Sequence, residues 1–481
     1  MLKKSTRQVL IVMSMLIKSA LSQTIGETER QMDSLFAGYH AGTPGVAVAM
    51  LKDGKVIFEK GYGMANLENG APITPKTVFH IASVSKQFTA FSIYLLQQEG
   101  KISFEDNVRK YLPELPDYGT PIKIRHLLAH TSGLRDQWGL LTLAGWRMDD
   151  VITTENILKI IMAQQEINFT PGSRFNYSNT GYTLLAEIVH RVTGKTFAEY
   201  TKEKIFQPLG MNSSQFYDDH RKIVTNRADS YERIDSAYFL KRLNYANVGA
   251  TGLLTTVDDL AKWVMNFEDP VVGDGALIES FNSPSYLDNG QKVVFSIIDG
   301  DTLFHAKGQL LRHYRGVNII KHGGHDACFR AFLARFPQQH FAVITLSNDE
   351  QYEIFKRGLE IVGFYLKDDL EPKKEMPVSP SAAANNNNAI YTTSLKDYEG
   401  DYYSDELSTG YRFKAARNRL IISHVRLPDI ELHRTGENKF SGSGEQTFAF
   451  ELTFLQDKKG RTDAFEISNY GVMKLRFERI R

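Results

Sequence analysis

Cysteine, charge of one sign and long apolar runs are all scarce in this sequence of 481 residues. Cysteine occurs once, at Cys328, so no disulfide can form within the chain. Lys and Arg number 57 against 56 Asp and Glu, a formal charge of +1, and the clustered positive charge that nucleic acid binding requires is not indicated. No segment after the N-terminal region reaches about eighteen uncharged apolar residues, so no stable membrane span is expected.

The overall composition is that of a soluble globular protein. Hydrophobic residues make up 42% of the chain and charged residues 23%. These values exclude collagen-like, coiled-coil and wholly disordered proteins. A chain of this length can bury a large core without disulfides or structural metals.

Residues 1–22 have the pattern of a secretory signal peptide. A basic start with Lys3, Lys4 and Arg7 precedes the apolar run 9–17, and the small residues Ala20 and Ser22 suit signal peptidase. The alternative is a frayed N-terminal helix. Cleavage would remove four positive and no negative charges, which leaves a formal charge of about −3. We therefore expect a periplasmic or secreted protein.

Composition divides the remaining chain into two unequal parts. Residues 368–393 are charged at first and then rich in Pro, Ala and Asn, which is typical of a linker. Residues 394–481 contain short aromatic and apolar stretches separated by turn residues, which indicates a small antiparallel β-domain, either a barrel or a sandwich. We expect this β-domain to pack on the larger part or to bind a partner.

The larger part, residues 23–367, mixes strand and helix patterns. The sequence predicts a hairpin over 46–60, helices over 85–99, 182–193 and 353–366, and strands over 329–336 and 341–347. An early hairpin, a helical middle and late strands favour an α+β fold, in which helices flank one antiparallel sheet.

A serine and a lysine stand three residues apart at the predicted start of the first long helix. One helical turn separates Ser83 from Lys86, so both side chains lie on one face. The helix N-terminus favours a developing oxyanion, and a desolvated lysine can act as a base near neutral pH. By itself this spacing is weak, because a capping serine and a solvated lysine would look the same.

Two later motifs strengthen this interpretation. Tyr177-Ser178-Asn179 lies in a turn before a predicted helix, and His322-Gly323-Gly324 follows an apolar stretch. The order Ser-x-x-Lys, Tyr-x-Asn, His-x-Gly resembles the penicillin-recognising serine hydrolases, and within them the class C β-lactamases and their relatives. These include D-amino acid peptidases, penicillin-binding-protein-like carboxypeptidases and β-lactamase-fold esterases. The resemblance covers about residues 30–367 and implies a β-lactamase/transpeptidase-like fold.

The resemblance also implies roles for individual residues. Ser83 would be the acylated nucleophile and Lys86 its proton acceptor or electrostatic partner. Tyr177 would be a general base or acid, with its phenolate favoured by Lys86, and Asn179 would hold Lys86 and the substrate. Together with Ser83, the residue after the third motif, His325, would supply the backbone N–H groups of an oxyanion hole.

In the third motif, His322 takes the place of a lysine in many relatives, and Gly324 lets the substrate backbone approach closely. Gly323 stands where relatives often have a hydroxyl residue, so we expect one donor to a substrate carboxylate to be missing. This departure predicts weak β-lactam hydrolysis.

Other chemistry has less support. A metal site formed by His322, His325, His305 and His313 matches no zinc spacing, so neither metal nor cofactor is expected. His130 is interpreted as structural, and Cys328 as a small buried residue. Residues 135–167, which include Trp138 and Trp146, are expected to cover the site.

The sequence thus predicts an exported serine hydrolase that acts through a Ser83 acyl-enzyme on an ester, amide or peptide, as an esterase or D-amino acid peptidase. The alternatives are a β-lactamase and a non-catalytic sensor of peptidoglycan or another ligand. Expected partners are small-molecule ester, peptide or β-lactam substrates and peptidoglycan, with no nucleic acid. Fold alone does not choose among these substrates.

Overall fold

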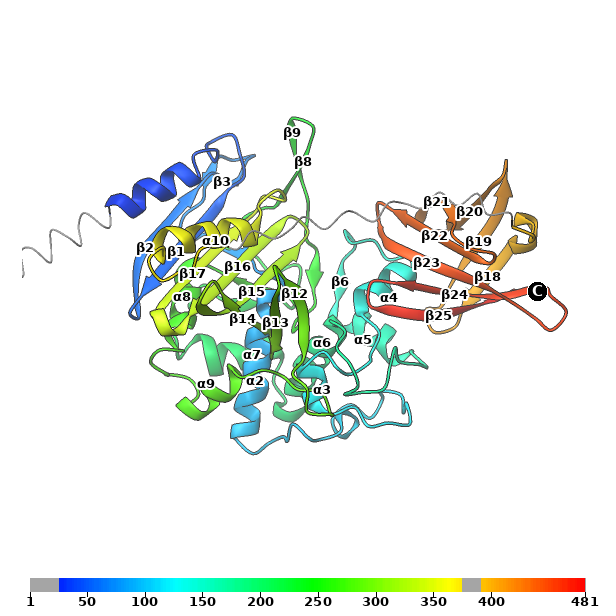
Figure 1. Cartoon of the computed structure of the whole chain (residues 1–481), viewed down its shortest axis with the longest axis horizontal. Helices are drawn as coiled ribbons and strands as arrows, with labels where there is room; N and C mark the ends of the chain where they lie inside the picture. The colour runs from blue at the N-terminus through cyan, green and yellow to red at the C-terminus, as the bar shows by residue number, and fades with distance from the viewer. Residues whose placement is uncertain (1–25, 374–390, 481) are drawn as a thin grey trace, which may run out of the picture.

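The computed structural model describes residues 26–373 and 391–480. They form a large domain, residues 26–373, and a smaller β-domain, residues 391–480, which is called the barrel below (Figure 1). The expected signal peptide and most of the expected linker lie outside the described residues. No helix in the described ranges is both long enough and apolar enough to cross a membrane.

The large domain is built on one antiparallel sheet of eight strands. Its spatial order is β12 (Val294–Ile298), β13 (Asp301–Ala306), β14 (Gln309–Tyr314), β15 (Val317–Asp326), β16 (Phe329–Phe336), β17 (Phe341–Ser347), β1 (Val46–Lys52) and β2 (Lys55–Tyr62). The predicted hairpin is confirmed as β1 and β2. Asp53 and Gly54 both have positive φ, as a tight two-residue hairpin turn requires.

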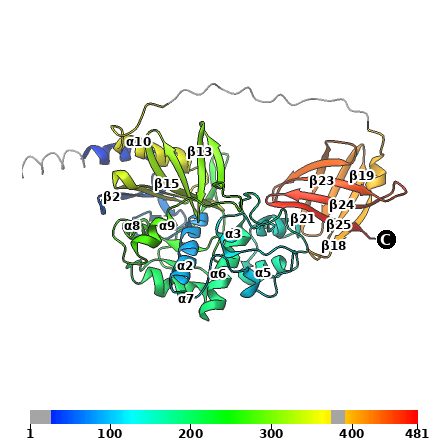
Figure 2. The ribbon, with the colours of Figure 1, turned by 60° about the horizontal axis from the view of Figure 1, so that its bottom comes forward.

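Both faces of this sheet are covered, and strand β1 shows why. Ala47, Ala49 and Leu51 face one hydrophobic core, while Val46, Val48 and Met50 face the other. Alternate residues of a strand point to opposite faces, so a strand buried on both faces reads as a continuous apolar run. Helix α10 covers one face, and α2, α6 and α7 lie on the other side of the sheet (Figure 2).

The helices of the large domain are mostly short, and α2 and α6 form the centre of the larger core. They are α2 (Lys86–Gln98), α3 (Ile124–Leu128), α4 (Gln137–Leu143), α5 (Thr154–Met162), α6 (Asn179–Thr193), α7 (Phe197–Thr201), α8 (Val257–Met265), α9 (Gly275–Phe281) and α10 (Ile354–Tyr365), and residues 26–35 are also helical.

Short elements connect these layers. They are the helical turns η1 (Ala82–Ser85), η2 (Val108–Lys110), η3 (Lys202–Phe206) and η4 (Pro337–Gln339), and the strands β3 (Met64–Asn66), β4 (Ala71–Pro72), β5 (Phe79–His80), β6 (Ile152–Thr153), β7 (Gln215–Phe216), β8 (Tyr231–Ile234), β9 (Ala237–Leu240), β10 (Tyr245–Ala246) and β11 (Leu253–Thr255).

The predicted elements match the observed ones closely. Strands 329–336 and 341–347 have the predicted bounds, and helix 353–366 is observed as Ile354–Tyr365. The first helix begins at Lys86 rather than at 85, because a tighter turn, η1, precedes it. Helix α6 begins at Asn179, three residues earlier than predicted, because Asn179 and Thr180 make buried polar contacts at its start.

The barrel consists of eight antiparallel strands. They are β18 (Gly400–Ser404), β19 (Thr409–Ala416), β20 (Arg419–His424), β21 (Leu427–Arg434), β22 (Lys439–Gly444), β23 (Thr447–Gln456), β24 (Thr462–Asn469) and β25 (Val472–Arg479). Pairing of β18 with β25 closes the barrel, so of the two predicted alternatives the barrel is correct. Aromatic rings fill its interior, and those of Phe465 and Phe477 stack 4.7 Å apart.

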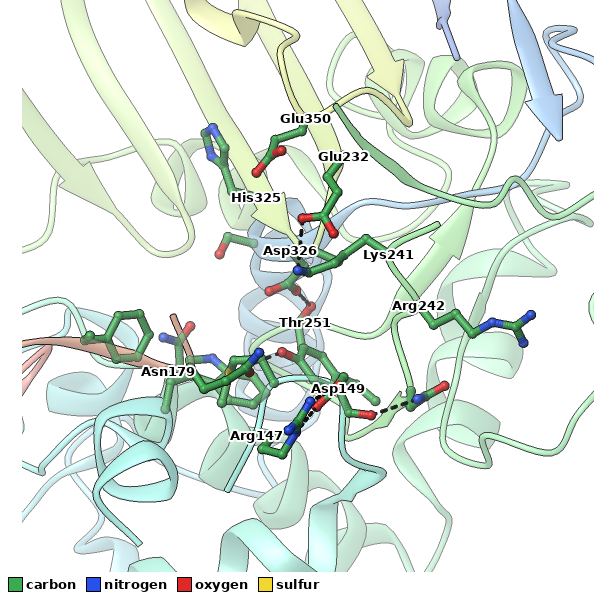
Figure 3. A pocket seen from close by; sticks show the side chains of 18 of the residues that line it. Arg147, Asp149, Asn179, Glu232, Lys241, Arg242, Thr251, His325, Asp326 and Glu350 are labelled. Atoms are coloured by element: carbon green, nitrogen blue, oxygen red, sulfur yellow. Dashed lines mark hydrogen bonds and ion pairs between the residues drawn. The ribbon is translucent and has the colours of Figure 1, made fainter. Parts of the chain in front are cut away.

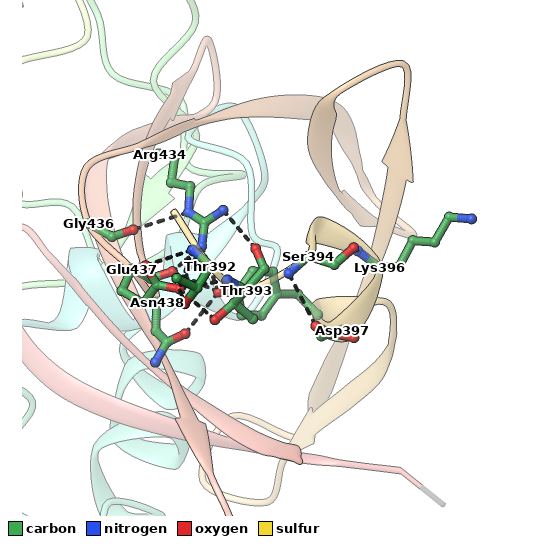
Figure 4. Close-up of polar contacts among 10 residues, drawn as sticks. Thr392, Thr393, Ser394, Lys396, Asp397, Arg434, Gly436, Glu437 and Asn438 are labelled. Carbon is green, nitrogen blue, oxygen red and sulfur yellow. Dashed lines mark hydrogen bonds and ion pairs between the residues drawn. The ribbon is translucent and has the colours of Figure 1, made fainter. Parts of the chain in front are cut away.

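The chain enters the barrel through a polar anchor (Figure 4). The carboxylate of Glu437 accepts hydrogen bonds from the hydroxyls of Thr392 and Thr393, each at 2.7 Å. These bonds lower the pKa of Glu437 to about 2. The Tyr398 hydroxyl donates to the Glu437 carbonyl at 2.7 Å. Turn η5 (Leu395–Tyr398) is thereby fixed to the turn between β21 and β22.

Candidate active site

Ser83 lies in the turn η1, immediately before helix α2. Ala82 has a φ of +47°, a left-handed conformation that is costly for a residue with a side chain. Ser83 is half-buried and borders a cleft, whereas its neighbours Val84 and Ser85 are fully buried. The strained turn therefore presents one hydroxyl to solvent at the start of a helix.

Lys86 is completely buried and makes three polar contacts through Nζ. Asn179 Oδ1 lies at 2.8 Å, the Ala250 carbonyl oxygen at 2.7 Å and Ser83 Oγ at 3.1 Å. Burial lowers the pKa of Lys86 to about 7, although the carboxylates of Asp326 and Asp136 oppose this shift. Near neutral pH a large fraction of Lys86 is therefore an uncharged amine.

The geometry sets the direction of these hydrogen bonds once Lys86 is neutral. An uncharged amine has two N–H groups and one lone pair. The oxygens of Asn179 and Ala250 can only accept, so they take the two N–H groups. The lone pair then faces the Ser83 hydroxyl, which can donate. In this state Lys86 is arranged as a base for Ser83.

Tyr177 lies close to Lys86, with 5.0 Å between Nζ and the ring centroid. Burial raises the pKa of the Tyr177 phenol well above its ordinary value, and a hydrogen bond with Ser83 only partly offsets this. The phenol therefore stays protonated in the free protein, and the expectation that Lys86 favours a phenolate is wrong. Because burial lowers the Lys86 pKa to about 7, the lysine is only partly charged near neutral pH and offers a phenolate less positive charge than an ordinary lysine would.

The His130 ring packs against the Tyr177 ring. Its ring lies 4.3 Å from the Tyr177 ring, centroid to centroid, and its Nδ1 accepts a hydrogen bond from the Ser178 backbone at 3.1 Å. Burial holds the pKa of His130 well below its ordinary value, so the ring is neutral. These contacts confirm that His130 has a structural role. The residue that it contacts, Tyr177, is a candidate catalytic residue.

Asp136 is a buried residue of the site that the sequence did not reveal. Its Oδ2 accepts from the backbone N–H of Asn179 at 2.6 Å and from Asn179 Nδ2 at 3.0 Å. Its Oδ1 caps helix α4 by accepting from the Trp138 backbone at 2.9 Å. This carboxylate fixes the orientation of the Asn179 amide, and with it the oxygen that faces Lys86.

Strand β15 brings the third motif beside η1. A side chain at Gly324 would place its Cβ 2.3 Å from the Ile81 carbonyl oxygen, so only glycine allows this approach. His322 is buried, and burial lowers its pKa to about 3, so it is neutral. His325 is exposed and, like Ser83, lines the cleft.

Gly323 faces the other side of the sheet. A Cβ at this position would lie 2.8 Å from side-chain atoms of Ile354 and Phe355 on α10. The expectation that Gly323 removes a hydroxyl from the substrate site is therefore wrong, because a hydroxyl here would point at α10. Residues 322 and 323 lie on opposite faces of the strand, as the two-residue period requires.

The cleft has a volume of about 1000 Å³ and borders both domains. Trp138 and Tyr245 stack at 4.8 Å on its large-domain side, and Phe448 and Tyr470 stack at 4.8 Å on its barrel side. Charged and polar side chains also line the cleft (Figure 3), and they include Arg147, Asp149, Glu232, Lys241, Thr251 and Asp326. Trp138 covers the site as predicted, whereas Trp146 packs beside Arg426 of the barrel.

The barrel is held against the site by the turn between β24 and β25. The Gly471 carbonyl oxygen accepts from the Asp136 backbone at 2.8 Å and from Asn168 Nδ2 at 2.9 Å. A second contact is the buried Arg135 guanidinium, which pairs with Glu406 at 2.8 Å. Tyr470 reaches the cleft, where the Asn179 side chain forms a polar contact with its hydroxyl. The expected packing of the β-domain on the larger part is confirmed.

Gly471→Ala is expected to lower kcat/KM for the hydrolysis predicted from the sequence about tenfold, without unfolding the protein. Gly471 has a φ of +66°, and a Cβ there would lie 2.4 Å from Asp136 Cβ, so the turn must move away from Asp136. Gly460→Ala is the matched control, since Gly460 has a φ of +76° in another barrel turn with nothing within 4 Å. Both variants carry the same kind of backbone strain, about 1 kcal/mol. Equal kcat/KM values in the two variants would therefore contradict the idea that the barrel turn at Gly471 supports the site through Asp136.

Within the described ranges, no group of three or more His, Cys, Asp or Glu side chains is arranged to hold a metal ion. Cys328 is buried, and burial raises its pKa to about 12, so its thiol is protonated at neutral pH. His305 and His130 lie 4.8 Å apart, but burial keeps both neutral. Ser83, Lys86 and Tyr177 therefore remain the candidate reactive groups of the site.

The residues of the sequence motifs therefore lie together at one site. The structure adds further residues to this site that the motifs do not contain. Asp136, the Ala250 carbonyl and the barrel turn around Tyr470 all contact Asn179 or Lys86, directly or through one residue. The sequence around these residues does not indicate a function. Asp136 has the pattern of a helix cap, and Tyr470 that of a turn residue next to a strand.

The chain is similar to known proteins over most of its length. A family model described as Beta-lactamase matches residues 32–361. Penicillin-binding protein 4* of Bacillus subtilis is 27% identical over 410 residues, which are 82% of this chain and 86% of that protein. The D-aminopeptidase of Gluconobacter oxydans is 27% identical over 305 residues, 63% of this chain and 56% of that protein. The chain thus spans only about half the length of that D-aminopeptidase.

Solved structures share the fold. The octameric penicillin-binding protein homologue from Pyrococcus abyssi has a TM-score of 0.64 at 24% identity, over 94% of this chain and 99% of that one. The D-amino acid amidase from Ochrobactrum anthropi has a TM-score of 0.54 at 21% identity, over 68% of this chain and 95% of that one. The family match covers most of the large domain and includes Ser83, Tyr177 and His322, so the chain belongs to the beta-lactamase family.

Proposed function

We propose that this protein is an exported serine hydrolase that forms an acyl-enzyme at Ser83 and cleaves an ester, amide or peptide bond. Derivatives of D-amino acids are the substrate class that we favour, because relatives are named D-aminopeptidase and D-amino acid amidase. The observation that carries the proposal is the buried Lys86 amine, whose lone pair is left to Ser83 Oγ at 3.1 Å.

In the proposed acylation step, Ser83 Oγ attacks the substrate carbonyl carbon and its proton passes to Lys86 Nζ. The backbone N–H groups of Ser83 and His325 stabilise the oxyanion that forms. The Tyr177 hydroxyl then gives its proton to the leaving group and regains one from Lys86. A water molecule cleaves the acyl-enzyme by the reverse proton path, which restores Ser83 and the neutral Lys86.

The two alternatives have less support. A β-lactamase of this kind gains from a cation in the third motif, but burial keeps His322 neutral, so β-lactam hydrolysis is expected to be weak. A sensor without turnover has no need of a neutral, buried lysine beside a serine. Burying the Lys86 amine costs desolvation free energy, and a site that only binds a ligand gains nothing in return.

The substrate proposal is tested with one panel on the purified protein. It contains D-alanine p-nitroanilide, its L-enantiomer, a p-nitrophenyl ester and a chromogenic cephalosporin. We expect turnover of the D-anilide and the ester, with an acyl adduct on Ser83 detected by mass spectrometry. Faster turnover of the cephalosporin than of the ester would favour the β-lactamase, and no turnover of any compound would favour the sensor.

The pH profile tests the role of Lys86. Its pKa is lowered to about 7, and the neutral form required of a base exists above that value. We expect kcat/KM to rise with pH through about 7 and to fall about tenfold per pH unit below it, since one proton inactivates the site. A profile that is flat between pH 5 and 8 would contradict Lys86 as the base.

Export remains a prediction from residues 1–22. Expression of the full chain in a bacterium with an outer membrane is expected to give a mature N-terminus near Gln23 in the periplasmic fraction. An unprocessed protein in the cytoplasmic fraction would contradict it.

A further inference from the structure

Three polar side chains meet beside Ser83, at the end of strand β15. His80 Nε2 lies 2.8 Å from Asp326 Oδ2, and Thr251 Oγ1 lies 2.9 Å from His80 Nε2 and donates to Asp326 Oδ2 at 2.5 Å. His80 precedes the turn η1 that carries Ser83, and Thr251 follows the Ala250 carbonyl that holds Lys86. Neither the acylation step nor the packing of the barrel uses this trio.

Asp326 presents part of its carboxylate to the cleft (Figure 3). Both of its hydrogen bonds use Oδ2, and among the described residues Oδ1 has no hydrogen-bond partner. The side chain is 17% exposed, so its position is fixed while one oxygen remains accessible. Its charge reaches the catalytic groups, since it opposes the lowering of the Lys86 pKa.

Three of the Lys and Arg side chains that line the cleft are engaged elsewhere, and the fourth, Arg242, lies more than 4 Å from the Asp326 carboxylate. Arg147 pairs with Asp149 at 2.7 Å, and Lys241 pairs with Glu232 at 3.0 Å. Arg330 donates to the carbonyl oxygens of Ala327 and Phe329 at 2.9 and 3.0 Å. Within the described ranges, His80 is the only basic side chain within 4 Å of the Asp326 carboxylate. A half-buried carboxylate without a permanent cation favours a cationic ligand.

Asp326 is also next in the chain to the residue that would hold the carbonyl of the bond to be cleaved. It directly follows His325, whose backbone N–H is the proposed oxyanion donor, and adjacent Cα atoms are about 3.8 Å apart. In an amino acid derivative, the amino nitrogen is two bonds from the carbonyl carbon. A carbonyl held at His325 therefore brings an α-amino group within reach of the neighbouring carboxylate.

We propose that Asp326 is a specificity-determining residue, which binds the free α-ammonium group of the substrate while His80 and Thr251 hold its carboxylate in place. This inference rests on the proposed hydrolase function. It narrows the substrate class to amides, esters and peptides of D-amino acids with a free amine, and disfavours their N-acylated forms. On binding, the ammonium group exchanges hydrogen bonds to water for a charge-assisted hydrogen bond to the fixed Asp326 carboxylate.

The wild-type protein provides the first test. Hydrolysis of D-alanine p-nitroanilide is compared with that of N-acetyl-D-alanine p-nitroanilide, which has the same leaving group and no positive charge. We expect kcat/KM to be about 10- to 100-fold higher for the free amine, as for one charged hydrogen bond. Equal values, or preference for the acetylated compound, would overturn the inference.

Asp326→Asn provides the second test, because it keeps the shape of the side chain and removes the charge. We expect the preference for the free amine to disappear, so that the ratio of kcat/KM for the free anilide to kcat/KM for the acetylated anilide falls to about one. Glu268→Gln is the matched control, since Glu268 pairs with His340 at 2.7 Å outside the cleft. Glu350→Gln removes a charge from the cleft itself and is expected to keep the preference.

The outcomes separate the two proposals. A preference that persists in Asp326→Asn, or that Glu350→Gln abolishes equally, overturns the role of Asp326. Ser83-dependent hydrolysis of the neutral ester leaves the hydrolase proposal intact in either case. An equal fall in kcat/KM for the free and the acetylated anilide in Asp326→Asn, with an unchanged thermal midpoint, would show that Asp326 acts only through the catalytic groups, and would overturn a role in binding. If Asp326→Asn does not fold, the wild-type comparison alone decides.

Discussion

Ser83→Ala is expected to abolish turnover of every substrate in the panel and to prevent acyl adduct formation. The loss in kcat should be on the order of 10⁴-fold or more, as for other serine nucleophiles. The protein should remain folded, because the Ser83 side chain forms no helix-capping hydrogen bond and contacts Lys86 and Tyr177 only through its hydroxyl. Thermal denaturation and intact-protein mass spectrometry after exposure to a p-nitrophenyl ester provide the measurement.

Ser85→Ala is the matched control for this prediction. Ser85 lies two residues further on in the same turn, fully buried, and its hydroxyl accepts from the Leu253 backbone at 3.2 Å. We expect this variant to lose about 1 kcal/mol of stability but to keep the adduct on Ser83. Retained turnover in Ser83→Ala would refute the proposed function, whatever Ser85→Ala shows.

Lys86→Met and Tyr177→Phe are each expected to lower kcat by about 100-fold or more. The methionine retains the length of the buried side chain without its amine, and the phenylalanine removes only the hydroxyl. Because both residues carry the same proton, the double variant should be little slower than the slower single variant. The measurement is kcat for the ester in all four proteins.

Tyr182→Phe separates this effect from a general loss of polar groups. Tyr182 is buried near Lys86, 5.7 Å from Nζ to the ring centroid, and its hydroxyl donates to the Leu128 carbonyl at 2.9 Å. It should lose stability but little activity. Losses in Lys86→Met and Tyr177→Phe that simply multiply in the double variant would show that the two residues act in separate steps.

Much of the fold was predictable from local patterns. Strands β16 and β17 are buried on both faces and are mostly apolar, apart from Arg330 and Arg335 in β16, so their bounds follow from the ends of the apolar stretches. The barrel followed from aromatic stretches spaced by turns. A barrel could not be told from a sandwich, because that difference depends on whether β18 meets β25, which local sequence does not encode.

The site was predictable only where its chemistry lies in motifs. Ser83, Lys86, Tyr177 and Asn179 carry their roles in short patterns, and the structure brings them together. The error at Gly323 arose from the resemblance, although strand alternation places residue 323 opposite His322. Asp136 was missed because a capping aspartate and a site carboxylate look the same until the chain is folded.

The contact between the barrel turn and the cleft has a consequence for folding kinetics. Asn168 and Gly471 are 303 residues apart in the chain, and Arg135 and Glu406 are 271 apart, yet both pairs join the barrel to the large domain. Contacts of such high sequence separation form late, after each domain has collapsed. During refolding, far-ultraviolet circular dichroism should therefore recover before hydrolysis of the ester does. Recovery of the proposed ester hydrolysis would then measure how fast the two domains dock.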